Sequence, residues 1–309
     1  HEYISKLQDL DIHVLFLPDD RKIRGVFDDE IDDESAFVEL SKFSDDWRRM
    51  KIRARRGSDH QRNFYLDATI AARRLNRWIQ DTALKASTTG DSNANEIYLD
   101  LLQRVSEGAQ EPSFGNNGNR QKLLEEVSEL SQKTETYVNY GLISGFPAER
   151  ITEIISNASD SALSTISFII EPYINSMTAR LRALKDLERT IRTFLETLSS
   201  FYVDKNVYFH VRDGLYVHSD EGDSIELNWL SSGERQLLTM LANTIMAKDM
   251  PTIFIIDEPE ISLNVKWQRT LLDALISLTQ DSDVQFLMAT HSIELLSQHK
   301  EKVVKLQAR

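Results

Sequence analysis

The sequence predicts an α/β protein, and the pattern of apolar residues carries this prediction. Two apolar runs that are typical of buried strands, 252–256 and 284–289, enclose the helical pattern of residues 265–278. Uninterrupted apolar runs are typical of parallel strands that are covered on both faces. Residues from about 35 to 200 instead carry apolar side chains at helical spacing. We therefore expect a parallel-sheet core combined with a large helical insertion.

The rest of the strands are expected near the two ends of the chain. Short strands joined by polar, glycine-containing turns are expected directly before residue 230. The strands expected outside the central unit are 12–17, Val203–His210, Leu215–His218, Ser224–Leu227 and an edge strand at Val303–Leu306.

The helical region reads as a compact bundle, with a short coiled-coil arm as the alternative. Three apolar stripes run through it, and the third is close to a heptad seam interrupted by Glu188. Pro172 is expected to break or kink its helix, because proline removes a backbone donor. The segment Gly115–Arg120 is expected to be a flexible loop. The stripes begin at Leu75, Leu124 and Met177.

Three polar elements follow one another within about 60 residues of the C-terminal region. The first is a serine-glycine turn at the start of a helix, where backbone N–H groups and the helix dipole favour an anion; an ordinary N-cap is the alternative. The second is a pair of carboxylates that ends an apolar strand. The third is a histidine that ends another strand, where a structural role is the alternative. The residues are Ser231, Ser232, Gly233 and Glu234; Asp257 and Glu258; and His291.

In this order the three elements resemble the signature motif, the Walker B strand and the switch histidine of the ABC-type ATPases. The resemblance implies ATP and Mg²⁺ as ligands, with Asp257 serving the magnesium ion and Glu258 acting as general base. It implies that His291 contacts the γ-phosphate and that the signature, Ser231 to Glu234, touches nucleotide held by a second subunit. Ser262 and Asn264 stand where the family has its D-loop. At least a homodimer is therefore expected.

The residues after Glu258 resemble the RecF/SMC/OLD side of this superfamily more than its transporter branch. The lysine-containing Walker A loop of the family is not found in the 309 residues. We expect it upstream, with a defective nucleotide site as the alternative, and we interpret the start of the chain as the end of an N-terminal ATPase lobe. The expected domains are 1–32 (end of that lobe), 33–200 (helical insertion) and 201–309 (C-terminal lobe).

Composition excludes several classes of protein. The chain has no cysteine, which excludes a disulfide framework and a thiolate zinc site and is compatible with a cytoplasmic location. No apolar run approaches the roughly 20 residues that cross a bilayer, so we expect no membrane-embedded chain.

Charge is distributed unevenly along an acidic chain of net charge −13. Residues 48–77 hold ten basic side chains against Asp59 and Asp67. This basic segment is a candidate surface for nucleic acid or an acidic partner. Pairing with the acidic run 28–34, or plain solvation, is the alternative. The candidate contact residues are Arg48, Arg49, Lys51, Arg53, Arg55 and Arg56.

These observations, with the resemblance, predict an ATPase of the OLD/RecF-like group. Several members of that group belong to anti-phage systems such as Septu, PARIS and retron-associated modules, and commonly control a partner nuclease or toxin. No nuclease motif is apparent after His291, so we expect the effector to be separate. Two alternatives stay open: a DNA-repair or chromosome-maintenance ATPase that binds DNA through the basic segment, and a scaffold that does not hydrolyse ATP.

Overall fold

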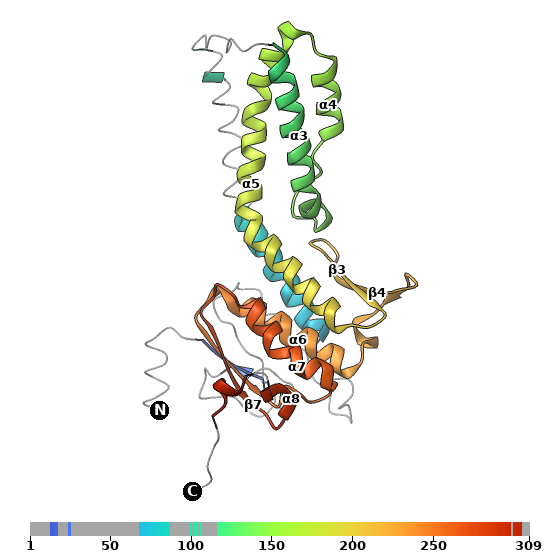
Figure 1. Cartoon of the computed structure of the whole chain (residues 1–309), viewed down its shortest axis with the longest axis vertical. Coiled ribbons are helices and arrows are strands. Elements are labelled where there is room, and N and C mark those ends of the chain that lie inside the picture. The colour runs from blue at the N-terminus through green and yellow to red at the C-terminus, as the bar shows by residue number, and fades with distance from the viewer. Residues whose placement is uncertain are drawn as a thin grey trace, which may run out of the picture. The chain divides into compact units, whose positions relative to one another are not determined.

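A computed structural model describes residues 13–17, 24–25, 68–86, 99, 102–103, 106, 116–297 and 299–304 (Figure 1). The chain forms two compact units. The first contains residues 1–75, 193–208 and 215–309, and the second contains residues 76–192 and 209–214.

A four-stranded sheet forms the centre of the first unit. Its strands are β1 (His13–Leu17), β2 (Arg24–Gly25), β6 (Thr252–Asp257) and β7 (Val284–Ala289), in the order β2-β1-β6-β7. Strands β1, β6 and β7 are parallel, and β2 pairs antiparallel with β1. The predicted α/β class with a parallel core is therefore confirmed. Because parallel strands β6 and β7 pair as far as Asp257 and Ala289, their carboxyl ends lie together.

Burial along the central strands is less even than the apolar runs indicate. In β6, Phe254 and Ile256 are fully buried. In β7 the side chains alternate between half-buried and exposed, and Leu287 is 61% exposed. Successive side chains of a strand point to opposite faces. The expectation that both faces of this strand are buried is therefore wrong for the described chain.

Among the described residues, three helices lie entirely within this unit: α6 (Ser232–Met246), α7 (Val265–Leu278) and α8 (Ile293–Ser297). Helix α7 has the predicted bounds, and Leu271 and Leu275 on its inner face are fully buried. Short 3₁₀ turns lie at Leu227–Trp229, Ala247–Asp249 and Lys300–Lys302. Residues 303–304 form no strand, so the predicted edge strand does not begin there; 305–306 lie outside the described residues.

A second, three-stranded sheet precedes the signature turn. It contains β3 (Lys205–His210), β4 (Gly214–Ser219) and β5 (Ser224–Ile225), in that order. Gly214 and Gly222 have φ values of +79° and +94°, which glycine adopts readily. The predicted strand at 224–227 is shorter than expected, because a 3₁₀ turn begins at Leu227.

The helical part includes residues 68–86, α3 (Asn116–Asn139), α4 (Ala148–Asn157) and α5 (Asp160–Phe201). Within the second unit, α3 lies beside the early turns of α5 and α4 lies beside α3 (Figure 1); the three helices share a core of Leu123, Val127, Ile155 and Leu163. The guanidinium of Arg120 donates to three carbonyl oxygens at the end of α4, those of residues 155, 156 and 158, at 2.8–2.9 Å.

Two expectations for the helical region, the loop at Gly115–Arg120 and a break at Pro172, are wrong. The predicted loop Gly115–Arg120 is helical from Asn116 onward, because α3 begins there. Pro172 does not break its helix, because it lies inside α5, which is 42 residues long in all. The interior apolar stripe on both sides of the proline holds the helix together, since Leu163, Leu181, Leu184 and Ile191 are all buried.

None of the helices in the described part of the chain is both long enough and apolar enough to cross a membrane.

Candidate functional site

The signature turn is fixed by a capping box at the N-terminus of α6. Ser231 is the N-cap: its Oγ accepts a hydrogen bond from the backbone N–H of Glu234 at 3.3 Å. In return, Glu234 Oε2 accepts from the N–H of Ser231 at 2.7 Å. This arrangement satisfies two backbone donors reciprocally. Ser231 and Ser232 remain exposed, so their hydroxyls and the first turn of the helix are accessible to a ligand.

Glu234, unlike the two serines, is buried, and only 5% of the residue is exposed. Its Oε1 accepts from Lys205 Nζ at 2.8 Å, and its backbone carbonyl accepts from Tyr202 Oη at 2.9 Å. Burial raises the pKa of Tyr202 well above its usual value, and the neighbouring Glu234 raises it further. The phenol therefore stays protonated and donates. Glu234 thus anchors the turn from inside, while the serines face outward.

Gly233 lies against the D-loop segment, 260–264. A Cβ placed on Gly233 would lie 2.6 Å from the backbone oxygen of Ser262 and 3.1 Å from the ring of Trp267. Ser262 itself has a φ of +64°, and the Trp267 ring packs edge-on against Phe201 at 6.0 Å. Only glycine fits this approach without displacement of its neighbours. The signature turn and the D-loop of one chain are therefore in direct contact.

The carboxylate pair lies at the carboxyl end of β6, as the sequence predicts. Asp257 is the last strand residue, and Glu258 follows with a φ of +45°. The N–H of Glu258 donates to the carbonyl of Ala289 at 2.8 Å, which ties it to the end of β7. A left-handed backbone at a residue other than glycine costs about 1–3 kcal/mol, and such strained residues cluster at active sites. Both carboxylates are half-buried, so they are accessible from the sheet edge.

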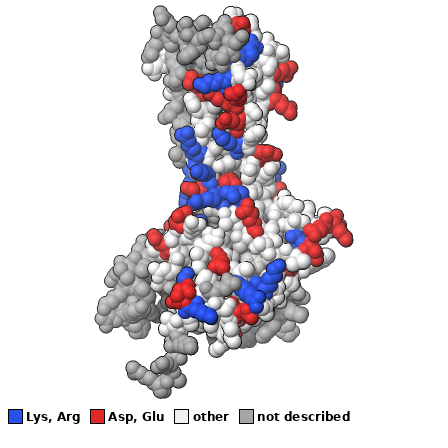
Figure 2. Space-filling view, viewed as in Figure 1, with Lys and Arg blue, Asp and Glu red and all other residues white. Residues whose placement is uncertain are grey.

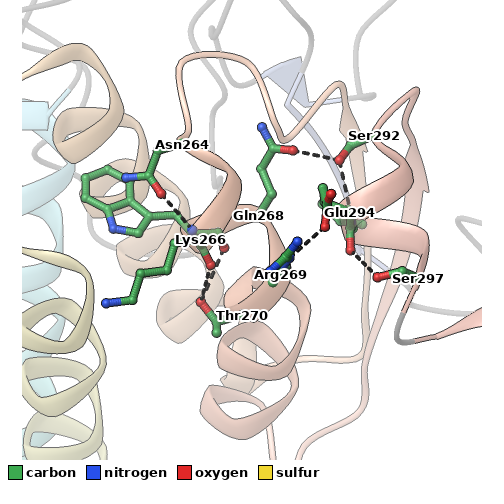
Figure 3. Close-up of polar contacts among 10 residues, drawn as sticks. Asn264, Lys266, Gln268, Arg269, Thr270, Ser292, Glu294 and Ser297 are labelled. Carbon is green, nitrogen blue, oxygen red and sulfur yellow. Dashed lines mark hydrogen bonds and ion pairs between the residues drawn. The ribbon is translucent and has the colours of Figure 1, made fainter.

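The histidine loop, residues 290–292, follows β7 and faces the same edge. Glu260 Oε1 accepts from the backbone N–H of His291 at 2.8 Å and from that of Ser292 at 3.0 Å. Ser292 Oγ donates to Gln268 Oε1 at 2.7 Å (Figure 3). The side chain of His291 is exposed. The backbone of the loop is therefore held by α7 and by the turn after β6.

The D-loop has its own internal support. Asn264 caps α7, since its Oδ1 accepts from the N–H of Trp267 at 2.9 Å (Figure 3). Gln268 Nε2 donates to the carbonyl of Leu263 at 2.8 Å. Gln236 of α6 donates to the carbonyl of Pro259 at 3.1 Å. The signature helix, the turn after β6 and α7 are thus linked by hydrogen bonds as well as by packing.

The structure brings together the predicted signature, carboxylate, D-loop and histidine residues within the first unit. It adds Lys205, Tyr202, Glu260 and Gln268, none of which the sequence singles out as a site residue. The only available signal was positional, because Glu260 and Gln268 stand in the expected D-loop segment and just after it. Lys205 and Tyr202 carry no such signal, since they meet the signature only through folding.

The donor set fits a magnesium ion shared with phosphate oxygens. Within the described residues no group of three or more acidic, histidine or cysteine side chains gathers to hold a metal ion. Mg²⁺ is commonly held by one or two carboxylates with the substrate phosphates and water. The half-buried Asp257 at a strand end meets that requirement.

The candidate basic residues Arg48, Arg49, Lys51, Arg53, Arg55 and Arg56 lie outside the described residues. Of the same segment, Arg73 and Arg77 are exposed. Burial lowers the pKa of Arg74, the arginine that follows Arg73 in the sequence. On the face drawn in Figure 2, the described acidic and basic side chains are interspersed.

Comparison with known proteins identifies a family that matches most of the chain. Residues 18–297 match the family model described as "AAA domain, putative AbiEii toxin, Type IV TA system". Among curated proteins, the chain is 24% identical over 219 residues to the DNA double-strand break repair Rad50 ATPase of Sulfolobus acidocaldarius. That match covers 63% of this chain and 24% of the relative.

Two further similarities are shorter or looser. The Rad50 ATPase of Sulfurisphaera tokodaii is 26% identical over 126 residues, which cover 40% of this chain and 14% of the relative. The matched regions thus span a quarter or less of the two Rad50 proteins. The Smc head domain of Pyrococcus furiosus, solved with an extended coiled coil and the C-terminal domain of ScpA, has 13% identity and a TM-score of 0.30. It covers 71% of this chain and 51% of that one.

Proposed function

The chain belongs to this AAA-domain family, an ATPase family with distant Rad50 relatives, and we propose that it binds and hydrolyses ATP at the edge formed by β6 and β7. The observation that carries the proposal is the network of contacts that joins four elements of the first unit. The carboxylate pair, the histidine loop, the D-loop and the signature turn are linked by short hydrogen bonds and by the Gly233–Ser262 contact.

Each side chain at this edge has a separate task. Asp257 holds Mg²⁺, which when bound neutralises phosphate charge. Glu258 orients a water molecule and accepts its proton, the role of a general base. His291 donates a hydrogen bond to a terminal phosphate oxygen. The left-handed backbone at Glu258 supports a special role for this residue, because strained backbone clusters at active sites.

The signature acts between two subunits in this proposal. Ser231 and Ser232 are exposed at the start of α6, where backbone N–H groups and the dipole favour an anion. Glu234 and Lys205 hold the turn from behind, so the serines require no rearrangement to meet a phosphate. Two copies that each present a signature to the other's nucleotide form a head-to-head dimer upon ATP binding.

We assign the dimer to the control of a separate effector, a nuclease or toxin, in anti-phage defence. The description of the family, which names an AbiEii toxin and a type IV toxin–antitoxin system, supports a role of this general kind. The resemblance to the OLD/RecF-like group, drawn from the residues after Glu258, supports it as well.

Light scattering of the natural full-length protein, with and without Mg-ATP, tests the proposal first. We expect the mass to double with Mg-ATP and to return to that of the monomer as ATP is consumed. An unchanged mass together with no phosphate release would contradict both the nucleotide site and the assembly. A mass that is dimeric under both conditions would favour the scaffold alternative.

The Rad50 relatives favour a second candidate, an ATPase of DNA repair or chromosome maintenance. In that case duplex DNA stimulates ATP turnover, and charge reversal at Arg53, Arg55 and Arg56 removes the stimulation. A matched reversal at Lys122, Lys133 and Arg182, which are exposed basic residues on α3 and α5, leaves it in place. Turnover that is indifferent to DNA would exclude this candidate.

A further inference from the structure

Glu260 links the turn after β6 to the histidine loop. One of its oxygens, Oε1, accepts two backbone hydrogen bonds, from His291 at 2.8 Å and from Ser292 at 3.0 Å. Hydrogen bonds to an ionised carboxylate are shorter and stronger than those between neutral groups. The other oxygen, Oε2, is buried and accepts no hydrogen bond from any described residue. Within the described chain, this carboxylate therefore accepts hydrogen bonds only from the histidine loop.

The ring of His291 has no comparable support of its own. The side chain is exposed, and no described residue forms a hydrogen bond with the imidazole. The position of the ring is thus set by its backbone, and the backbone is fixed by Glu260. Gln268 braces the next residue, since Ser292 Oγ donates to Gln268 Oε1 at 2.7 Å.

The turn that carries Glu260 has a constrained backbone. It lies between Glu258 and Ser262, both of which have left-handed backbones with φ values of +45° and +64°. The N–H of Leu263 donates to the carbonyl of Glu260 at 3.0 Å, and that of Ile261 donates to the carbonyl of Glu258 at 3.1 Å. Through its hydrogen bonds, the Glu260 carboxylate therefore fixes the histidine loop relative to the end of strand β6.

Resting on the proposed ATPase function, we propose that Glu260 is a positioning residue that acts through His291. It holds the histidine at a fixed distance from the general base Glu258 and makes no contact with nucleotide. A displacement of about 1 Å at a catalytic group costs as much as 100-fold in rate, so this brace governs turnover more than binding.

Amide hydrogen exchange of the full chain without nucleotide tests the brace independently of ATP hydrolysis. Glu260→Ala is expected to raise exchange in the peptide containing His291 and Ser292 at least about fivefold, because the N–H of His291 loses its acceptor and that of Ser292 keeps only Thr290 Oγ1, at 3.0 Å. Glu260→Gln keeps a carbonyl acceptor and retains most of the protection. The matched control is Glu294→Ala, which removes a nearby carboxylate that pairs with Arg269 and contacts neither N–H. Unchanged exchange in Glu260→Ala overturns the proposal.

A double-mutant cycle with His291→Ala then tests whether Glu260 acts through the histidine. In the natural full-length protein, Glu260→Ala is expected to lower kcat about 10- to 100-fold with a KM for ATP within about threefold of wild type. Added to His291→Ala, it lowers kcat no further, since its target is gone. Glu260→Gln restores most of kcat. Additive losses, or an equal loss in Glu294→Ala, would assign Glu260 a merely structural role.

Two further outcomes are separable. If Glu260→Ala does not fold, Glu260→Asp makes the same comparison, because it keeps the charge but withdraws the acceptor by one methylene. If wild type shows the expected exchange protection but releases no phosphate, the proposed function fails while the brace itself stands.

Discussion

Gly233 and the carbonyl oxygen of Ser262 lie in direct contact, so close that a Cβ on the glycine would come within 2.6 Å of that oxygen. The signature turn and the D-loop of one chain therefore form one surface. A change at either position alters the shape that this surface offers to a second subunit.

Gly233→Ala is expected to destabilise the fold by about 1–3 kcal/mol, because the methyl group must displace backbone and the Trp267 ring. Chemical denaturation of the chain measures this change. Gly145→Ala is the matched control, because no atom lies within 4 Å of a Cβ at that position. Equal stabilities of the two variants would show that the contact is looser than described. In the full-length protein, Gly233→Ala is further expected to weaken the ATP-dependent dimer.

Lys205→Met tests the anchor behind the signature turn. Removal of the ammonium leaves the buried carboxylate of Glu234 without its partner, which is expected to cost about 2–4 kcal/mol. The midpoint of urea unfolding measures the loss. Lys133→Met is the control, since it breaks an exposed pair with Glu129 and is expected to cost less than about 0.5 kcal/mol. If the Lys205→Met variant is as stable as this control, the Lys205–Glu234 ion pair does not anchor the signature turn.

Glu258→Gln is expected to lower ATP turnover at least about 100-fold, because the amide cannot accept the proton of the attacking water. ATP-dependent assembly is expected to persist and to outlast that of wild type, since nucleotide is no longer consumed. Phosphate release and light scattering on the same sample measure the two effects. Unchanged turnover in the full-length protein would exclude Glu258 as the base and favour a scaffold.

His291→Ala is expected to lower kcat about 10- to 100-fold, because a hydrogen-bond donor to the reacting phosphate is removed. Since the side chain is exposed and bonds to no described residue, stability is expected to change by less than about 0.5 kcal/mol. Steady-state kinetics and thermal denaturation measure these effects. His218→Ala, on β4 beside Tyr216, is the control in the same unit. A loss of stability that matches the loss of rate would indicate a structural histidine.

The sequence by itself determined the elements whose cause is local. Helix α7 has its predicted bounds, because Asn264 caps it and an apolar face repeats along it. The carboxylates stand at a strand end, and the serine turn opens a helix, because capping and periodicity are properties of neighbouring residues. The same reasoning misjudged Asn116–Arg120, which is helical, and the break expected at Pro172, where buried residues on both sides of the proline belong to one helix.

The tertiary structure alone decided which residues support the site. Lys205 and Glu234 are 29 positions apart, and Glu260 and His291 are 31 apart, so no local pattern joins them. The same holds for Gly233, whose need for glycine comes from a carbonyl group 29 residues further along the chain rather than from its own φ. Hydrogen bonds and close packing act at a few ångströms whatever the separation in sequence. The sequence therefore provides the reactive groups, whereas the fold provides the partners that hold them in place.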